Sequence, residues 1–236
     1  MIALRCHASR MTVINFALLP DGVFVVADTL VTTDRFQPGF FTSKVHPVPH
    51  LNGLICGTGD LDFIIAWSRH VLGGMLAFDI THLDEFAPDS LRSLHGNLPG
   101  PERDAMTSTI YHLGFDEQED RFVGFAYRSA ADFESERLDS GIRTKPGYAG
   151  SLPLTGFPDD FVEVCRAQRI EQDELPAADR VFIGGHIIAY MMQVHRTDGR
   201  RPSIATTITR PFEFEDFEKV YYDCTTSLAA NSHLRD

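Results

Sequence analysis

Three residues in the first part of the chain carry groups that could together perform nucleophilic acyl transfer. Thr12 supplies a hydroxyl, Asp28 a carboxylate and Lys44 an ammonium, and both intervals between them are 16 residues. A threonine hydroxyl is a weak nucleophile and needs an adjacent base. A free α-amino group with a pKa of about 8 can be that base when the threonine is the first residue. An ammonium nearby lowers the proton affinity of the hydroxyl, and a carboxylate can hold the ammonium in place.

Short strands at the start of the chain would position these groups. The sequence predicts strands over 12–19, 23–29, 41–48 and 51–56. The first two are β-branched and apolar, and the turn Pro20-Asp21-Gly22 joins them into a hairpin buried on both faces. In this arrangement Thr12 opens the first strand, Asp28 closes the second and Lys44 lies on the third.

The rest of the chain alternates between helical and extended patterns. Leu61 to Phe78 has apolar residues at helical spacings, with Asp60 as its N-cap. The sequence also predicts a helix around 90–94, strands over 107–115 and 121–128, a loop over 140–158, a helix over 159–172 and a strand over 203–209. Residues 179–194 fit a helix by length and a buried strand by composition, and a charged stretch over 212–219 precedes a polar tail. This order indicates two helical layers around a pair of sheets in a single domain.

The first quarter of the chain resembles the catalytic β-subunit of the proteasome and its bacterial relatives, in the N-terminal nucleophile (Ntn) hydrolase superfamily. The resemblance runs from Thr12 to about Val71. It rests on Thr-Val-Ile, an Asp-Gly turn, Val-Val-Ala-Asp, Ser-Lys-Val, the strand His-Leu-Asn-Gly-Leu-Ile-Cys-Gly and a Gly-rich turn that opens a helix, all in the family's order. It implies an α+β fold, a four-layer αββα sandwich of two antiparallel sheets flanked by helices, over residues 12–236.

The resemblance also implies roles for the site residues. Thr12 would be the nucleophile, Lys44 would depress the proton affinity of its hydroxyl and amine, and Asp28 would fix Lys44. Arginine could not easily replace Lys44, because its charge is spread over a planar fork and does not titrate. Backbone N–H groups of the turn from Gly57 to Gly59 would face the oxyanion of the tetrahedral intermediate. The product would be an acyl ester on Thr12, released by water.

Family members carry further residues around this site. A Ser-Gly pair is expected in the middle of the chain, where Ser140-Gly141 and Gly150-Ser151 compete for the position. An Asp and a Ser are expected before the late strand, and Asp179 and Asp198 are candidates for the Asp.

The amine of Thr12 can act only if it is free, and residues 1–11 precede it. Translation could begin at Met11, so that removal of this methionine exposes Thr12. Alternatively, residues 1–11 are a propeptide removed by self-cleavage. A third alternative is that the leader stays and the protein is inactive.

Composition narrows the class of protein. The chain has 236 residues, 43% of them hydrophobic, which excludes a disordered chain. Its net charge of −12 and its lack of clustered Lys and Arg argue against nucleic-acid binding. No apolar run suits a secretory signal or a membrane span, so a cytoplasmic protein is predicted.

Cysteine and histidine patterns favour neither a disulfide framework nor a metal site. Cys6, Cys56, Cys165 and Cys224 form no CxxC pair. His46 and His50 have no carboxylate partners and are interpreted as surface loop residues. No cofactor and no metal are predicted.

Three functional hypotheses remain at this point. The first is a threonine peptidase acting on peptides or unfolded proteins, which the resemblance associates with a homo-oligomeric ring and with an ATP-dependent unfoldase as a possible partner. The second is a catalytically silent structural subunit of the same fold. The third is an Ntn hydrolase of small amides, because the fold does not decide the substrate.

Overall fold

A computed structural model describes residues 13–33, 37–97, 107–150, 156–177 and 179–232. Within them the chain is a mixed α+β structure with three antiparallel sheets and five α-helices. The strands are β1 (Ile14–Leu19), β2 (Gly22–Asp28), β3 (Leu30–Thr32), β4 (Pro38–Phe41), β5 (Val45–Val48), β6 (Gly53–Thr58), β7 (Thr109–Asp116), β8 (Arg121–Arg128), β9 (Ser135–Arg137), β10 (Gly141–Lys145), β11 (His186–His195) and β12 (Ser203–Glu213). The helices are α1 (Leu61–Gly74), α2 (Ile80–Asp84), α3 (Ala87–Asn97), α4 (Asp159–Asp173) and α5 (Phe217–Ser232), with 3-10 turns η1 (Pro49–Leu51) and η3 (Ser129–Ala131).

Two five-stranded sheets form the centre of the molecule. Sheet A has the strand order β10-β1-β2-β11-β12, and sheet B has the order β5-β6-β7-β8-β9. The remaining strands, β3 and β4, pair with each other as a short ribbon.

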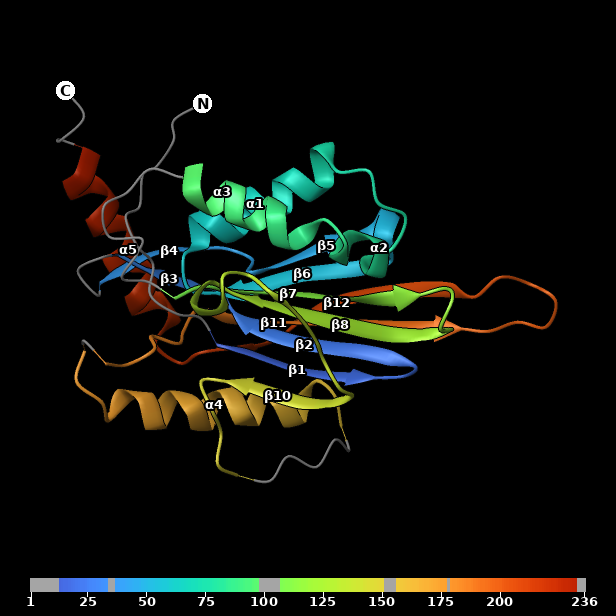
Figure 1. Ribbon diagram of the computed structural model, residues 1–236. Coiled ribbons are helices and arrows are strands. Elements are labelled where there is room, and N and C mark those ends of the chain that lie inside the picture. Colours follow the sequence, from blue (N-terminus) through green and yellow to red (C-terminus); the bar gives the residue numbers. More distant parts are fainter. Residues whose placement is uncertain (1–12, 34–36, 98–106, 151–155, 178, 233–236) are drawn as a thin grey trace.

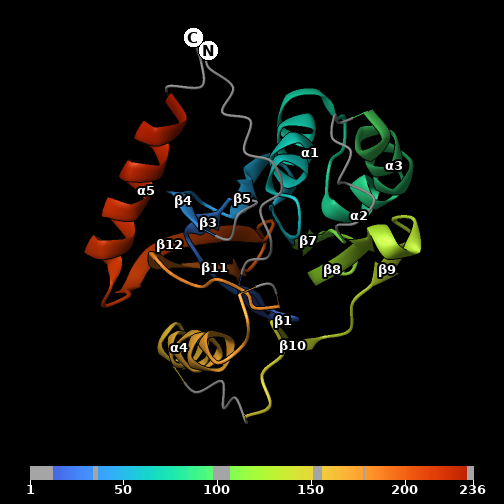
Figure 2. The same cartoon turned by 90° about the vertical axis from the view of Figure 1, so that its left-hand side faces the viewer.

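Helices lie on the outer faces of the two central sheets (Figures 1 and 2), and buried side chains show where the core lies. Buried residues of both sheets, among them Phe16 and Leu113, pack into one cluster between them. Helices α1, α2 and α3 cover the outer face of sheet B, where Trp67 is fully buried. Helix α4 covers the outer face of sheet A through Phe161. Helix α5 packs on the β3–β4 ribbon through Val220.

The predicted first hairpin, the pair of strands expected over 107–115 and 121–128, and several predicted boundaries are confirmed. β1 and β2 pair across the turn at Pro20-Asp21-Gly22, and β7 and β8 form the second hairpin. The Asp60 side chain caps α1 by accepting hydrogen bonds from the N–H groups of Asp62 and Phe63. Helix α4 closely matches the helix predicted over 159–172.

Other predicted boundaries were wrong in the first half of the chain. The strand predicted over 41–48 is split into β4 and β5, because the N–H of Thr42 bonds to the carbonyl of Thr29 and the Ser43 hydroxyl bonds to the carbonyl of Val45. The strand predicted over 51–56 begins two residues later, after η1. The helix predicted to reach Phe78 ends at Gly74, the second of two adjacent glycines, since glycine disfavours helix.

Three assignments in the second half also needed correction. The loop predicted over 140–158 contains β10, which pairs with β1 along its whole length. Residues 179–194 divide into an irregular segment and the strand β11, because β2 and β12 offer ladder partners on both sides. The charged stretch and polar tail contain the end of β12 and helix α5, whose buried side includes Val220 and Cys224.

Candidate functional site

A buried ion pair joins two of the predicted site residues. The prediction that Lys44 lies on a strand was wrong, because it lies in the connection between β4 and β5, whereas Asp28 ends β2 as predicted. The Lys44 Nζ donates to Asp28 Oδ1 at 2.6 Å and to the carbonyl oxygen of Leu30 at 2.5 Å. The Lys44 and Asp28 side chains are 2% and 0% exposed. The interval of 16 residues therefore corresponds to direct contact.

The second oxygen of Asp28 is also occupied. Asp28 Oδ2 accepts the N–H of Gly184 at 3.0 Å, and the carboxylate also accepts a backbone hydrogen bond from Val13. Val13 is next in sequence to Thr12, so the carboxylate holds both the ammonium and the start of the first strand. An ammonium has three N–H donors. Among the described residues two donors of Lys44 are bonded, and one remains for a further acceptor.

Burial and attraction act in opposite directions on this pair. Burial raises the pKa of Asp28 and lowers the pKa of Lys44, because it penalises both charged forms. The attraction and the hydrogen bond between the two groups counteract both shifts. Because the Lys44 side chain is almost completely buried, water screens its charge little from neighbouring groups.

A segment that precedes β11 closes the site on one side. The N–H of Leu30 bonds to the carbonyl of Gly184, and the N–H of His186 bonds to the Thr29 hydroxyl at 2.9 Å. Gly185 has a φ of +78°, and a Cβ there would lie 2.4 Å from Thr29 Oγ1. Only glycine allows this approach without strain.

Helix α4 packs against β1 on the outer face of sheet A. Asn15 of β1 is fully buried and donates to Gln168 Oε1 at 2.8 Å and to Cys165 Sγ at 3.3 Å, both on α4. The Asn15 side-chain oxygen accepts the N–H of Lys145, so the cluster joins β1, β10 and α4. Burial and the nearby Asp28 carboxylate raise the pKa of Cys165, which keeps it a neutral thiol.

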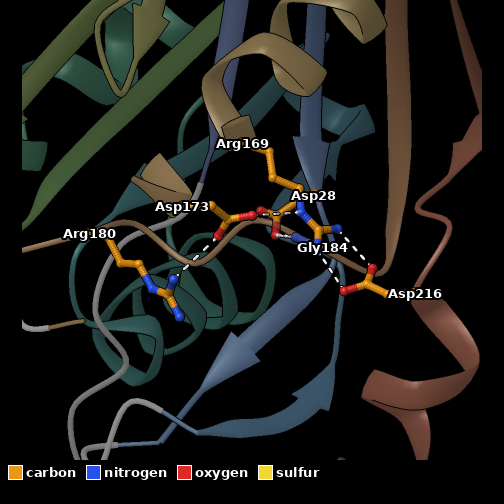
Figure 3. A network of polar contacts seen from close by, with 6 residues as sticks. All are labelled: Asp28, Arg169, Asp173, Arg180, Gly184 and Asp216. Atoms are coloured by element: carbon orange, nitrogen blue, oxygen red, sulfur yellow. Dashed lines mark hydrogen bonds and ion pairs between the residues drawn. The ribbon is translucent and has the colours of Figure 1, made fainter. Parts of the chain in front are cut away.

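Ion pairs fix the far end of α4, as Figure 3 shows beside the contact of Asp28 with Gly184. Arg169 makes two parallel hydrogen bonds to Asp216, at 2.8 and 2.6 Å, and lies over the ring of Phe214. Arg169 holds the pKa of Asp216 below its usual value. Asp173 contacts both Arg169 and Arg180, which links α4 to the segment that leads to Gly184.

The predicted glycine turn is shorter than expected, because Gly57 and Thr58 belong to β6 and pair with Ile110 and Thr109 of β7, so that only Gly59 lies in the turn. Val45 pairs with Cys56, so Lys44 and Gly57 follow one step beyond the last pair of β5 and β6. On this side no strand of the described part of the chain faces Gly57 and Thr58. Close packing also explains why both positions are glycine. A Cβ at Gly57 would lie 2.7 Å from the Thr109 carbonyl oxygen, and a Cβ at Gly59 would lie 2.5 Å from the Thr107 carbonyl oxygen.

The structure does not bring Ser140 into this group. Ser140 is exposed and precedes Gly141, which pairs with Leu18, whereas Ile14 pairs with Ala27 beside Asp28. The separation of four residues along β1 corresponds to about 13 Å.

The other predicted residues divide between exposed and undescribed positions. Asp179 lies in an exposed turn before the Gly184 segment, and Asp198 lies in the exposed connection between β11 and β12. Thr12 and Ser151 lie outside the described residues.

Sequence reasoning missed the backbone groups of this site. The ion pair is fixed by three backbone groups, which are the N–H of Gly184, the N–H of Val13 and the carbonyl of Leu30. Every residue type except proline has these groups, so the sequence does not indicate which of them take part. The adjacent glycines 184 and 185 were the available signal, because two glycines after an apolar run often mark a close backbone approach.

Comparisons with known proteins give no family. No family model matches the chain, and no curated protein matches it.

In the part of the chain that the structure describes, no three His, Cys, Asp or Glu side chains are grouped so that they could hold a metal ion. Among the described helices, none is both long enough and apolar enough to cross a membrane.

Proposed function

We propose that this protein is an amide-bond hydrolase with Thr12 as an N-terminal nucleophile, acting on peptides as a proteasome β-subunit-like threonine peptidase. The observation that carries the proposal is the buried Lys44 ammonium, which Asp28 and the Leu30 carbonyl hold, while its third N–H donor has no partner within the described part of the chain. Asp28 also binds the N–H of Val13, the residue after Thr12. A single carboxylate thus connects the ammonium to the strand that the nucleophile would open.

The proposed reaction proceeds through an acyl ester. The Thr12 hydroxyl oxygen attacks the substrate carbonyl carbon, and its proton passes to the free α-amino group. Backbone N–H groups between Gly57 and Gly59 stabilise the oxyanion, beside the Lys44 charge. The C–N bond breaks as the α-ammonium returns the proton to the leaving amine. Water then attacks the ester, giving its proton to the α-amine, and the acid leaves as Thr12 is regenerated.

The proposal extends to fold and assembly. Two antiparallel sheets with helices on their outer faces support the four-layer αββα sandwich of the Ntn hydrolases. The homo-oligomeric ring, the unfoldase partner and the cytoplasmic location follow from the resemblance and composition of the chain and belong to the same proposal.

The test begins with the N-terminal residue. Protein expressed from Met1 and from Met11 is analysed by intact mass, and both forms are assayed with fluorogenic peptides and with small amides. We expect hydrolysis only where the chain begins at Thr12. Thr12→Ala should reduce turnover at least 1,000-fold, on the order of the loss seen for other catalytic nucleophiles. Thr12→Ser keeps a hydroxyl and is the matched control.

Each alternative predicts a different result. Hydrolysis of small amides without hydrolysis of peptides would identify a small-amide hydrolase. A chain that keeps Met1 in its native host and is inactive would be a structural subunit. Undiminished turnover by Thr12→Ala would reject the mechanism.

A further inference from the structure

The outer edge of sheet A is an open strand. β12 pairs with β11 on one side, and no strand within the described ranges pairs with its other side. Residues 205–211 are all exposed, and Ile208 keeps 53% of its surface in solvent. An edge strand presents unpaired N–H and C=O groups to solvent, and these can pair with a strand of another chain.

Charged residues and prolines usually protect an edge strand from pairing with another chain, and they occur only at the two ends of β12. Arg201 and Pro202 precede it, and Arg210 and Pro211 coincide with an irregular register between β11 and β12. Residues 203–209 between them contain no charge and no proline, and most are β-branched. Such a segment has a high preference for strand pairing.

We propose that β12 pairs antiparallel with β12 of a second copy of this chain, about a two-fold axis at Thr206. The sequence is close to symmetric about this residue. Thr206 then faces Thr206 of the second copy, Ile204 faces Ile208, and Ser203 faces Thr209. Directly opposed Thr pairs and β-branched pairs each stabilise an antiparallel ladder by roughly 0.2–1 kcal/mol.

Neighbouring registers are poorer. An axis at Thr207 places Ile204 against Arg210 and Ser203 against Pro211. An axis at Ala205 places Ile208 against Pro202. Proline has no N–H to donate to a ladder, so both shifts lose a hydrogen bond and the contact between isoleucines.

Charges at the ends of the strand favour antiparallel over parallel pairing. Antiparallel pairing brings the end with Arg200 and Arg201 toward the end of the second copy that carries Glu213 and Glu215. The Arg201 side chain is 90% exposed, and its contact with Glu117 is 3.9 Å long. Under this axis Arg210 lies opposite Pro202, next to Arg201. Glu213, which contacts His186 at 2.8 Å, lies opposite Gly199. Charges of both signs therefore meet at each end, whereas parallel pairing would place each charge opposite its own copy, which disfavours parallel pairing.

This contact is independent of the proposed catalysis. It needs no nucleophile, and it is isologous, so it closes with two copies. A ring requires a different, heterologous surface, and the two contacts can coexist in one assembly.

The first test uses cysteine cross-linking of the full chain. In Thr206→Cys the two new side chains face each other across the axis, with Cβ atoms about 5 Å apart, and mild oxidation should give a covalent dimer. Thr209→Cys is the matched control, because six residues of strand, about 20 Å, separate its two copies. Wild-type protein reports any cross-linking by the native cysteines.

The second test measures molar mass by light scattering. Thr206→Lys places two like charges opposite each other and should halve the mass of the smallest assembly, whereas Thr206→Val should keep it. Circular dichroism establishes that each variant is folded. A wild-type chain that stays at 26.4 kDa at high concentration would overturn the proposal. Equal cross-linking at positions 206 and 209 would also overturn it.

Discussion

Lys44 and Asp28 are costly to bury singly and tolerable as a pair. Removing one partner leaves an uncompensated charge in the interior, which destabilises proteins by about 3–5 kcal/mol. We expect Lys44→Met and Asp28→Asn each to lower the free energy of unfolding by this amount. The double variant should lose less than the sum of the two.

Urea unfolding of the four proteins measures this coupling. All three variants should be inactive if the proposed mechanism holds, including the double variant, although it should be the most stable of the three. Additive losses would mean that the contact at 2.6 Å contributes no coupling energy.

His112 should make the fold sensitive to acid. It accepts a hydrogen bond from Trp67 Nε1 at 2.8 Å, and burial lowers its pKa from 6.5 to about 3. Below pH 6.5 the unfolded chain therefore binds a proton that the folded chain does not, so stability falls as the pH drops toward 3. The slope is about 1.4 kcal/mol per pH unit.

His112→Gln is the control for this titration, because its amide oxygen can still accept from Trp67. Urea unfolding from pH 7 to pH 4 should give a steeper loss of stability in the wild type than in this variant. Parallel pH profiles would contradict the assignment to His112.

At the residue scale, the contact between Asp28 and Lys44 was predicted from the resemblance of the first quarter of the chain to a known family, and the opposite charges of the two side chains agree with it. Ser140 shows the limit of that reasoning. A short Ser-Gly motif recurs by chance, and only the pairing of β10 with β1 decides at which end of the sheet it lies.

Elements were predictable where periodicity and turn chemistry agreed. The β1–β2 hairpin has apolar strands and a Pro-Asp-Gly turn, and α4 has a clear helical pattern. β10 was missed because residues 140–158 are rich in Gly, Ser and Pro, which is typical of a loop, and because its strand conformation depends on the ladder that β1 offers. Residues 179–194 were ambiguous for the same reason, since tertiary pairing decides them.

The prediction at the scale of the element concerns the segment with Gly184 and Gly185, which precedes β11. Gly185→Ala would place a methyl group 2.4 Å from Thr29 Oγ1 at a φ of +78°. The strain should cost about 1–3 kcal/mol and should move the Gly184 N–H away from Asp28. Gly147→Ala is the control, because a Cβ there meets nothing within 4 Å.

Thermal unfolding compares the two glycine variants. We expect a lower midpoint for Gly185→Ala and an unchanged midpoint for Gly147→Ala. Equal midpoints would show that the segment yields without strain, and the closure of the site beside Asp28 would then not depend on glycine.

At the scale of the whole molecule, the central cluster contains side chains of both sheets, and no sheet has a core of its own on that face. Phe16 of sheet A contacts Tyr111 of sheet B with ring centroids 5.2 Å apart. Neither sheet can lose its structure without exposing the inner face of the other. Residues 12–236 were predicted from the sequence to be one domain, and this shared core provides the physical reason to expect a single cooperative transition.

Trp67 makes the expectation measurable, because it is the chain's one tryptophan and lies buried in the core between α1 and the outer face of sheet B. Its fluorescence reports on sheet B and its helices, whereas far-ultraviolet circular dichroism reports on all elements. We expect the two signals to give the same urea midpoint and the same slope. Phe161→Ala, in the core between sheet A and α4, should lower both midpoints together, because large-to-small changes cost about 3–5 kcal/mol. A fluorescence midpoint that stays in place while the dichroism midpoint falls would show that the two sheets unfold as separate units.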